Sequence, residues 1–550
     1  MSCRAPDLLP TNSARIDSRI GWSTLGPVAV ITVFGLAVRA IPVLASPFPL
    51  NDGGLFVRMA ETVASSGFSF PSTIDYNGTA IPFAYPPIGI YLVAALHQMV
   101  GLSYTDLARF LPLLIAAATV PVVTLICLEL LDSTVAALVA GSAYALMPRA
   151  WEWLVGGGGL TRSPGVLLAL TAILVAIRTM RGQAHAGYLI AGALLGMTGL
   201  AHPQAVMFGI ASVLFVMAWR RGPSLPRRIG VTLFAAGIVL APWIVVVLMI
   251  HGPAPYIAGL RTGESPLAAI PLLIGLRFTG APVADVFVVL FGMGFLTAIA
   301  RREFFLPAFA ALLFFVDPRA SGQYAMLPVS MLIGAAASDL VRLRVPARSV
   351  LSRKPLSLSM NLVIVGLLTF GLVGSLLAPL RTGTPLEALS TSDRQAMIWV
   401  KAQPPARYAV ISGEAWEPDQ TSEWFPEITG AISVATVQGT EWTSANWAET
   451  VRRHRQLQRC AEQRIGCLLQ WMAEFGIVDY FYVSGRRDVA LLASRPCCNS
   501  IALAMEHDPR FARVYAENGV EIFRVDAGLP TTRASQAPIR TIAPVVGRMF

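Results

Sequence analysis

Charged residues are scarce in this chain. Only 13% of its 550 residues are Asp, Glu, Lys or Arg, whereas soluble proteins carry about a quarter. Hydrophobic residues make up 55% of the chain, and the mean hydropathy is +0.61. The shortage of charge excludes an ordinary soluble globular protein and predicts a polytopic α-helical membrane protein.

Lysine is nearly absent: Lys354 and Lys401 are the two lysines, and all other basic residues are arginines. The net charge of +10 has the sign that nucleic acids attract. The arginines, however, fall between apolar runs, where a membrane protein meets anionic headgroups. We therefore expect membrane lipids, and no nucleic acid, as partners.

The chain also lacks a visible internal repeat and a cleavable signal. Residues 1–23 are polar and contain arginines, without a small-residue cleavage site after a short apolar core, so the first apolar run is expected to stay as an anchor. A membrane span needs roughly 20 apolar residues. About eleven transmembrane helices are predicted, at 27–45, 108–131, 133–148, 164–180, 186–200, 203–219, 229–250, 282–300, 303–316, 323–341 and 360–380.

Arginines gather in alternate loops, and the arginine-rich loops of a membrane protein are the cytoplasmic ones. This places the N-terminus in the cytoplasm and the chain in the plasma membrane. The arginine-rich loops hold Arg4, Arg15, Arg19, Arg178, Arg181, Arg220, Arg221, Arg227, Arg228, Arg301, Arg302, Arg342, Arg344, Arg348 and Arg353. The loops 47–107, 149–163, 251–281 and 317–322, and everything after residue 381, are then extracytoplasmic.

The polar C-terminal region has a different composition. Strand-like segments begin at Tyr408, Tyr480 and Val520, and helical segments lie at 446–458 and 468–475. This alternation predicts an extracytoplasmic α/β domain. The expected organisation is a cytoplasmic tail at 1–24, a transmembrane domain at 25–381 with a large first outer loop at 47–107, the α/β domain at 382–528 and a disordered tail at 529–550.

Four of the six cysteines fall in the C-terminal region: Cys460, Cys467, Cys497 and Cys498. Four cysteines permit two disulfides in three connectivities, which would need an oxidising compartment. Four free thiols are the alternative. No CxxC pair or nearby histidine supports a metal site there.

Asp52 lies just after the first apolar run, in the sequence Asn51-Asp52-Gly53-Gly54. Acidic groups near hydrocarbon are costly and tend to be functional. As a functional group, Asp52 would be a general base toward an acceptor hydroxyl or amine, or a ligand to a divalent cation. The alternative is that Asp52 is the N-cap of a helix beginning near Gly53.

A glycine-rich segment, Gly156 to Gly159, precedes Arg162 in the second outer loop. Consecutive glycines leave backbone N–H groups open to an anion, and Arg162 could grip a phosphate in a bidentate way. The alternative is a flexible reentrant loop. Arg319, which follows Asp317-Pro318 in an outer turn, is a second candidate phosphate ligand; an ion pair with Asp317 is the alternative.

Other polar side chains of the outer loops are candidates for substrate contact. Tyr85 stands before Pro86-Pro87, and the apolar stretch that follows, to Val100, predicts a helix at the membrane interface. A lone histidine between two apolar runs is more often an interfacial structural residue. The candidates are Arg58, Tyr85, Glu152, His202, Glu264 and Tyr324.

Together these residues resemble the C-type superfamily of membrane glycosyltransferases, which use polyprenyl-phosphate-linked sugars and include protein O-mannosyltransferases and lipid A aminoarabinose transferases. The likeness covers residues 25–380 in layout and is sharpest from Asn51 to Leu92, including Pro82-Phe-Ala-Tyr-Pro-Pro87. In that family an acidic residue of the first outer loop is catalytic, which corresponds to Asp52. Many members have Asp-Glu where this chain has Asn51-Asp52, and this departure weakens the inference of a metal site.

The resemblance implies sugar transfer, with inversion, from a polyprenyl-phosphate donor to a glycan, lipid or protein acceptor on the extracytoplasmic side. Asp52 would be the base, and Arg162 and Arg319 would hold the donor phosphate. A divalent cation, bound by Asp52, is an open expectation. Two alternatives remain: a transporter or lipid flippase without chemistry, and an inactive accessory subunit that binds glycan.

Overall fold

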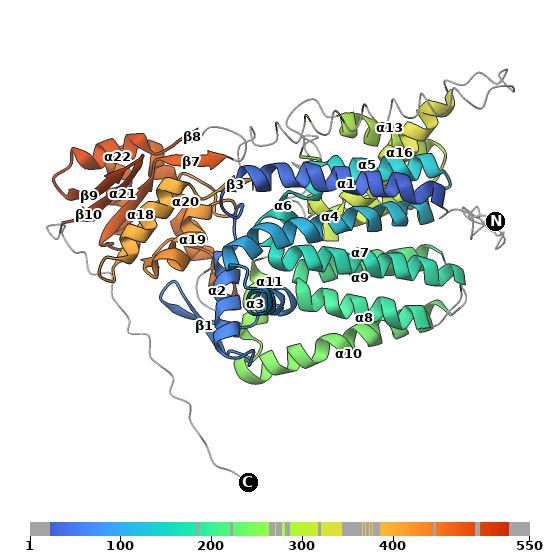
Figure 1. The fold of residues 1–550 in the computed structure, drawn as a ribbon, viewed down its shortest axis with the longest axis horizontal. Helices are drawn as coiled ribbons and strands as arrows, with labels where there is room; N and C mark the ends of the chain where they lie inside the picture. The colour runs from blue at the N-terminus through green and yellow to red at the C-terminus, as the bar shows by residue number, and fades with distance from the viewer. Residues whose placement is uncertain are drawn as a thin grey trace, which may run out of the picture.

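The protein is described here from a computed structural model. It describes residues 22–182, 186–220, 224–262, 270, 278–280, 286–316, 321–343, 366, 369, 373, 377, 386–443, 447–489 and 495–526. Within these residues, a bundle of long helices lies beside a smaller domain built on a β-sheet (Figure 1).

The long helices of the bundle run side by side, and consecutive helices are mostly antiparallel (Figure 1). Ser103 and Ser133 cap two of them by accepting hydrogen bonds from the backbone N–H of Asp106 and Ala136. The helices are α1 (Trp22–Ala45), α4 (Tyr104–Leu130), α5 (Thr134–Leu146), α7 (Gly159–Gly182), α8 (Ala186–Ala201), α9 (Pro203–Trp219), α10 (Leu225–His251), α13 (Val286–Ala300), α14 (Phe305–Val316) and α16 (Met326–Leu343).

Four of the described helices, α1, α4, α7 and α10, are long and apolar enough to cross a membrane. Helix α10 leaves Phe234 67% and Met249 81% exposed, which suits contact with lipid tails better than contact with water. The prediction of a polytopic helical membrane protein is confirmed in kind. The expected run at 360–380 lies outside the described residues, apart from four helical positions, so the expected number of eleven spans stays a prediction.

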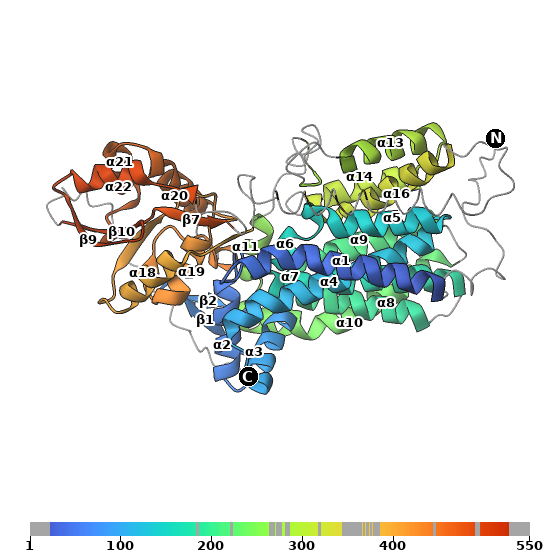
Figure 2. The same cartoon turned by 45° about the horizontal axis from the view of Figure 1, so that its top comes forward.

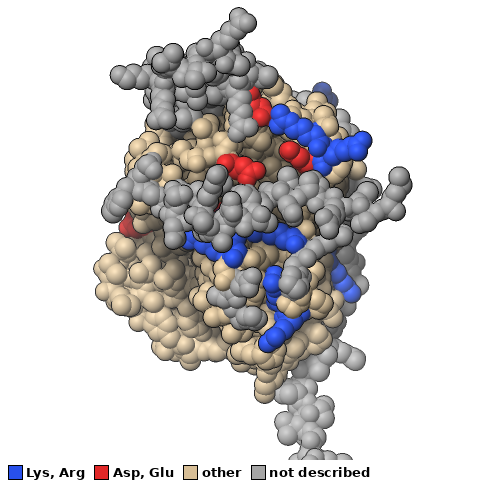
Figure 3. Space-filling view, turned by 90° about the vertical axis from the view of Figure 1, so that its right-hand side faces the viewer, with Lys and Arg blue, Asp and Glu red and all other residues tan. Residues whose placement is uncertain are grey.

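Basic side chains gather at one end of the bundle, with a few acidic ones among them (Figure 3). Helix α7 ends there with Arg178 and Arg181, which pair with Glu129 of α4. Arg301, after α13, pairs with Asp339. These ends belong to the loops in which the sequence predicts a cytoplasmic excess of arginine.

The first outer loop folds into a helix, a hairpin and a second helix, at the opposite end of the bundle (Figure 2). The hairpin turns at Asn77-Gly78, where φ is 53° and 69°; Asn-Gly is favoured in such two-residue turns because both positions need positive φ. The second helix is the one expected at the membrane interface. The elements are α2 (Gly54–Ser65), β1 (Thr73–Tyr76), β2 (Thr79–Pro82) and α3 (Ile88–Val100).

Short helices fill the outer end of the bundle. They connect the long helices where the sequence predicts extracytoplasmic loops. They are η2 (Pro148–Ala150), α6 (Glu152–Val155), α11 (Ala254–Arg261) and α15 (Ser321–Tyr324).

The C-terminal domain contains a mixed five-stranded sheet of order β5-β4-β6-β10-β9 and a smaller sheet of order β3-β7-β8. In the large sheet, β4 is parallel to β5 and β6, and the other pairs are antiparallel. The strands are β3 (Glu387–Ala388), β4 (Arg407–Ile411), β5 (Ile432–Ser433), β6 (Tyr480–Ser484), β7 (Arg486–Val489), β8 (Arg495–Pro496), β9 (Phe511–Glu517) and β10 (Val520–Val525).

Helices cover this sheet, and a buried cluster that includes Phe481, Trp471 and Ile501 forms its core. The predicted strands are present as β4, β6 and β10, and the two predicted helices as α20 and α21. Disulfides link Cys460 to Cys467 and Cys497 to Cys498. The helices are α18 (Thr391–Lys401), α19 (Gln420–Thr429), η5 (Thr440–Trp442), α20 (Trp447–Arg459), η6 (Cys460–Glu462), α21 (Ile465–Phe475) and α22 (Asn499–Glu506).

The C-terminal domain is attached to the first outer loop by backbone and side-chain hydrogen bonds. Leu50 forms an isolated β-bridge with Ala388. Asn77, in the hairpin, donates to the carbonyl oxygen of Ser433 at 2.9 Å and accepts from its N–H at 2.7 Å. These contacts hold the chain around Asp52 between the bundle and the sheet domain.

A buried arginine also orders the outer part of the bundle. Arg39 of α1 is fully buried and donates to the carbonyl oxygen of Ala145, in the last turn of α5, at 2.8 Å. Its guanidinium lies 5.7 Å from the ring centroid of Trp151. A cation is favourable at a helix C-terminus, so Arg39 holds α1 against the C-terminal end of α5. The glycine-rich segment follows α5 in the sequence.

Candidate functional site

Asp52 lies in a tight turn between α1 and α2. Asn51 has φ 53° and Gly53 has φ 137°, a value that side chains with a Cβ rarely adopt. Gly53, not Asp52, is the N-cap residue of α2, and no side chain caps this helix. The alternative interpretation of Asp52 as the helix cap is therefore wrong.

The Asp52 carboxylate instead faces the glycine-rich segment. Its Oδ1 accepts a hydrogen bond from the N–H of Gly158 at 2.9 Å. Gly158 immediately precedes α7, and the N-terminus of a helix favours a negative charge. The carboxylate is thus held in place by a backbone group 106 residues away in the sequence.

The expectation that the glycine N–H groups stay open to an anion is wrong for most of this segment. Gly157 donates to the carbonyl oxygen of Leu50, Gly158 to Asp52, and Gly159 to the carbonyl oxygen of Gly156. The segment therefore binds the Asp52 turn instead of leaving these N–H groups free for a phosphate.

Close approach of the Asp52 turn requires glycine at two positions of this segment. A Cβ on Gly158 would lie 2.3 Å from Oδ2 of Asp52, and one on Gly157 would lie 1.8 Å from its carbonyl oxygen. The Asp52 turn therefore fits against this segment only because both positions lack a side chain.

Arg162 lies in the first turn of α7, four residues after Gly158, and is half-buried. It donates to the carbonyl oxygen of Trp153 at 2.9 Å, and its guanidinium lies 5.4 Å from the Trp153 ring centroid. Within the described part of the chain, Arg162 forms no ion pair with a carboxylate. A half-buried guanidinium that retains unused N–H donors is suited to bind an anion.

Tyr85 is close enough to both Asp52 and Arg162 for each charge to act on its hydroxyl group. Its hydroxyl is 3.2 Å from Oγ1 of Thr161, and its ring packs against Phe56 and Trp442 at centroid distances of 4.9 and 5.3 Å. Burial raises the pKa of Tyr85 to about 12; the charge of Arg162 acts to lower this pKa, and that of Asp52 to raise it. The structure thus brings Asp52, Tyr85 and Arg162 into one neighbourhood.

Other predicted residues have structural contacts. His202 is the N-cap of α9, where its Nδ1 accepts from the N–H of Ala205 at 3.4 Å. Glu152, in α6, is 1% exposed. Arg58 pairs with Glu427 of the C-terminal domain at 2.8 Å and with Glu61 at 3.4 Å.

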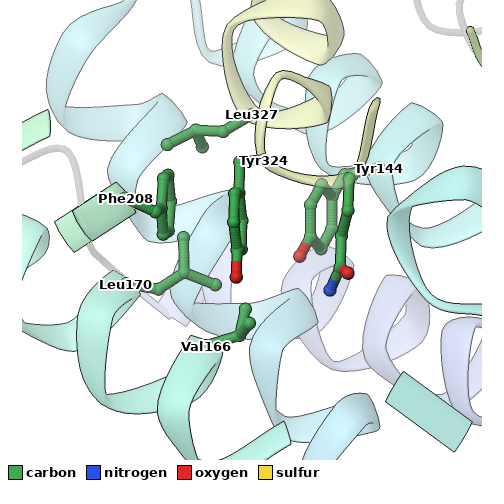
Figure 4. Close-up of a pocket in the computed structure, with 7 residues that line it drawn as sticks. Tyr144, Val166, Leu170, Phe208, Tyr324 and Leu327 are labelled. Carbon is green, nitrogen blue, oxygen red and sulfur yellow. The ribbon is translucent and has the colours of Figure 1, made fainter. Parts of the chain in front are cut away.

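Two predicted residues, Glu264 and Arg319, lie outside the described residues, so their roles stay predictions. Tyr324 is described and stacks on Phe208 with a centroid distance of 4.7 Å. Both rings line a small cavity of about 10 Å³, together with Tyr144, Val166, Leu170, Gln323 and Leu327 (Figure 4). This is close to the space that one water molecule needs, so the cavity is no lipid channel.

Sequence reasoning missed two residues of the C-terminal domain that contact the Asp52 turn. Glu423 is 2% exposed, and its Oε1 accepts from the N–H of Gly53 at 2.9 Å. Trp424 donates from its indole N–H to the carbonyl oxygen of Asn51 at 3.0 Å. Both belong to α19, more than 365 residues from the turn, and no local sequence signal announces such a contact.

Arg149 was also not selected from the sequence. It lies in η2, its backbone N–H donates to Thr279, and its side chain packs against Gly322. Its buried Nε has no hydrogen-bond partner within the described residues. The sequence signal was available, because Arg149 stands at the start of the same outer loop as Arg162.

A metal site was an open expectation for Asp52. Among the residues that the structure describes, no group of three or more His, Cys, Asp or Glu side chains is arranged to hold a metal ion. The carboxyl group of Glu423 contacts this turn at the residue after Asp52, where it accepts a hydrogen bond from the N–H of Gly53.

Comparison with known proteins bears on the fold. No protein-family model matches the chain, and no curated protein sequence matches it. Among solved structures, ArnT from Cupriavidus metallidurans bound to undecaprenyl phosphate superposes with a TM-score of 0.50 at 14% identity, covering 92% of this chain and 98% of ArnT. The arabinofuranosyltransferase AftD from Mycobacteria aligns at 13% identity with a TM-score of 0.49, and the match covers 91% of this chain and 40% of AftD.

The match to ArnT extends over nearly the whole length of both chains, so it includes the helical bundle and the C-terminal sheet domain. The superposition shows a common architecture. At 14% identity it says nothing about the chemistry, which has to be argued from the residues of the site. The chain therefore has the fold of ArnT, as expected from the family that the sequence resembles.

Proposed function

We propose that this protein is a membrane glycosyltransferase that moves a sugar from a polyprenyl-phosphate donor to an acceptor on the extracytoplasmic side. The observation that carries this proposal is the position of the Asp52 carboxylate. It is fixed by the N–H of Gly158, at the N-terminus of α7, in the neighbourhood of Arg162. The fold shared with ArnT, a protein whose structure contains undecaprenyl phosphate, supports the choice of donor.

In the proposed reaction, an acceptor hydroxyl attacks the anomeric carbon of the donor sugar. The new C–O bond forms as the bond from that carbon to the phosphate oxygen breaks, and the bonding electrons leave with the phosphate. Attack from the face opposite the leaving group inverts the anomeric centre. The acceptor proton passes to Asp52, a contribution of about 10²–10⁴-fold in rate for a well-placed base.

Arg162 is proposed to bind the donor phosphate, and Arg319 is retained as a second candidate. A guanidinium stabilises the charge that grows on the departing phosphate, and its planar donors match phosphate oxygens.

The orientation follows from the two ends of the bundle. The end that carries Arg178, Arg181 and Arg301 is proposed to be cytoplasmic (Figure 3). The Asp52 turn and the C-terminal domain, 382–528, are then extracytoplasmic. This orientation also suits the disulfides of the C-terminal domain, which require an oxidising compartment.

The test uses purified protein in detergent, a panel of polyprenyl-phosphate-linked hexoses and pentoses, and a cell-envelope extract as acceptor. Mass spectrometry follows the release of free polyprenyl phosphate. We expect Asp52→Asn to lower release at least 100-fold while undecaprenyl phosphate still binds to the protein. Full activity of a folded Asp52→Asn variant would refute the assignment of the base. Transport of lipid-linked sugar across the membrane of proteoliposomes, without release of polyprenyl phosphate, would favour a flippase.

A further inference from the structure

The further inference concerns how the C-terminal domain contributes to the Asp52 centre, and it rests on the function proposed above. The two residues on either side of Asp52 bond to this domain. The N–H of Asn51 donates to the carbonyl oxygen of Glu387 at 2.7 Å, its carbonyl oxygen accepts from Trp424, and the N–H of Gly53 donates to Glu423. Asp52, between them, bonds through its side chain to Gly158 of the bundle.

The fit on the side of the C-terminal domain is as close as on the side of the glycine-rich segment. A Cβ on Gly53 would lie 3.2 Å from the ring of Trp424 and 3.0 Å from the backbone of Gly157. The peptide that carries Asp52 is therefore sandwiched between the bundle and α19. A shift of α19 would move the carboxylate relative to Gly158.

Glu423 is unusual among these contacts because it is ionisable and almost fully buried. Its Oε2 has no hydrogen-bond partner within the described residues. Burial, followed by the charges of Asp52 and Glu441, raises the pKa of Glu423 well above its usual value, and the N–H groups of Gly53 and Leu55 oppose this effect. Burial among these groups therefore favours the uncharged form of the Glu423 carboxyl group.

Among the residues that the structure describes, no basic side chain forms an ion pair with Glu423. Facing it are Asp52 in the turn and Glu441 in η5, while Tyr76 of the hairpin donates its hydroxyl hydrogen to the Glu423 carbonyl oxygen at 2.6 Å. Arg58, the nearest basic residue of α2, is already paired with Glu427 and Glu61. Ionised Glu423 would place a second buried negative charge beside Asp52, which is costly.

We propose that Glu423 is a positioning residue: supplied by the C-terminal domain, its carboxyl group accepts a hydrogen bond from the N–H of Gly53 and thereby keeps the Asp52 carboxylate directed at Gly158. Glu423 does not touch the reacting atoms. When Glu423 ionises at alkaline pH, its charge repels that of Asp52. This repulsion displaces the turn and lowers the activity.

Three variants test this proposal in the full-length protein with the release assay. Glu423→Gln keeps an oxygen acceptor for Gly53 and cannot ionise; we expect it to retain at least half of the wild-type kcat at pH 7 and to remain active at alkaline pH where the wild type declines. Glu423→Ala removes the acceptor, and we expect a fall in kcat of more than tenfold with the donor KM within threefold. Glu427→Gln, one helical turn later in α19, is the matched control and should keep the wild-type alkaline decline.

Hydrogen exchange of the peptide 50–57 gives a readout that does not depend on turnover. We expect exchange at the Gly53 amide to be at least tenfold faster in Glu423→Ala and unchanged in Glu423→Gln. Wild-type kcat and wild-type exchange in Glu423→Ala would overturn the proposal, and so would a Glu423→Gln variant as inactive as Asp52→Asn, because that would make Glu423 a proton carrier. Activity of Asp52→Asn itself would instead defeat the proposed function, so the two failures are distinguishable.

Discussion

The carboxylate of Asp52 accepts a hydrogen bond from the backbone N–H of Gly158, so the first outer loop and the start of α7 form one unit. This relationship places a negative charge at a helix N-terminus, where it is favourable. It also makes the position of the proposed base depend on the absence of a side chain at residue 158. That dependence leads to the first prediction.

Replacing Gly158 by alanine should displace Asp52. The added Cβ would lie 2.3 Å from Oδ2 and 2.7 Å from Cγ of Asp52, distances at which the carboxylate must move. Because a misplaced base loses its contribution, we expect Gly158→Ala to lower kcat about 100-fold or more, measured by release of polyprenyl phosphate. The matched control is Gly182→Ala at the other end of α7, where a Cβ meets nothing within 4 Å. An active Gly158→Ala variant would show that Asp52 works from another position.

Arg162→Ala tests the proposed phosphate contact. A hydrogen bond to a charged group contributes about 1.5–3 kcal/mol, so we expect binding of undecaprenyl phosphate to weaken about ten- to hundredfold, measured by native mass spectrometry. Arg178→Ala is the control: Arg178 is on the same helix, about 24 Å away along its axis, and pairs with Glu129. Equal binding by the two variants would remove Arg162 from the phosphate site.

Local sequence patterns predicted the elements whose causes are local. Hydropathy located α1 and α10, and the composition of Val520 to Val525 predicted β10 with its observed bounds. Asp52, Tyr85 and Arg162 could be selected because each stands in a recognisable outer-loop motif. Glu423 and Trp424 could not, since their importance comes from contacts with residues 53 and 51, which folding alone brings together.

In the glycine-rich segment, the sequence identified the binding residues but not the group that they bind. Four consecutive glycines predicted N–H groups that bind an anion, and Gly158 does bind one, but it is the carboxylate of Asp52. The sequence contains both halves of this contact, yet their separation of 106 residues leaves no periodicity from which the pairing could be read.

The disulfide between Cys460 and Cys467 should stabilise the C-terminal domain. It closes a short loop at the junction of α20 and α21, and the loss of chain entropy in the unfolded state corresponds to about 2 kcal/mol for a loop of this length. We expect the double variant Cys460→Ser, Cys467→Ser to lower the Tm of this domain, measured by differential scanning fluorimetry. A reductant should lower the wild-type Tm by more than that of the variant, and a variant Tm equal to that of the oxidised wild type would contradict the assignment.

Burial of Glu427, at its contact with Arg58 of α2, makes the stability of the protein depend on pH. Burial raises the pKa of Glu427 to about 7, although the ion pair with Arg58 acts in the opposite direction. The unfolded chain, with the ordinary value of 4.5, releases this proton earlier than the folded chain does. Between these two values the folded state binds more protons, so the free energy of unfolding must fall as the pH rises from about 4.5 to about 7. The stabilisation from proton uptake is fully present below pH 4.5 and is lost above pH 7.

Glu427→Gln removes this titration and isolates its contribution. We expect the Tm of the wild type to decline more steeply than that of the variant between pH 5 and pH 7, measured in the same detergent at constant ionic strength. Because burial opposes the charged form of Glu427, we also expect the variant, with its uncharged amide, to be at least as stable as the wild type at pH 7. Parallel Tm profiles of the two proteins would show that Glu427 is ionised throughout, with the Arg58 guanidinium dominating over burial at the contact between α2 and α19.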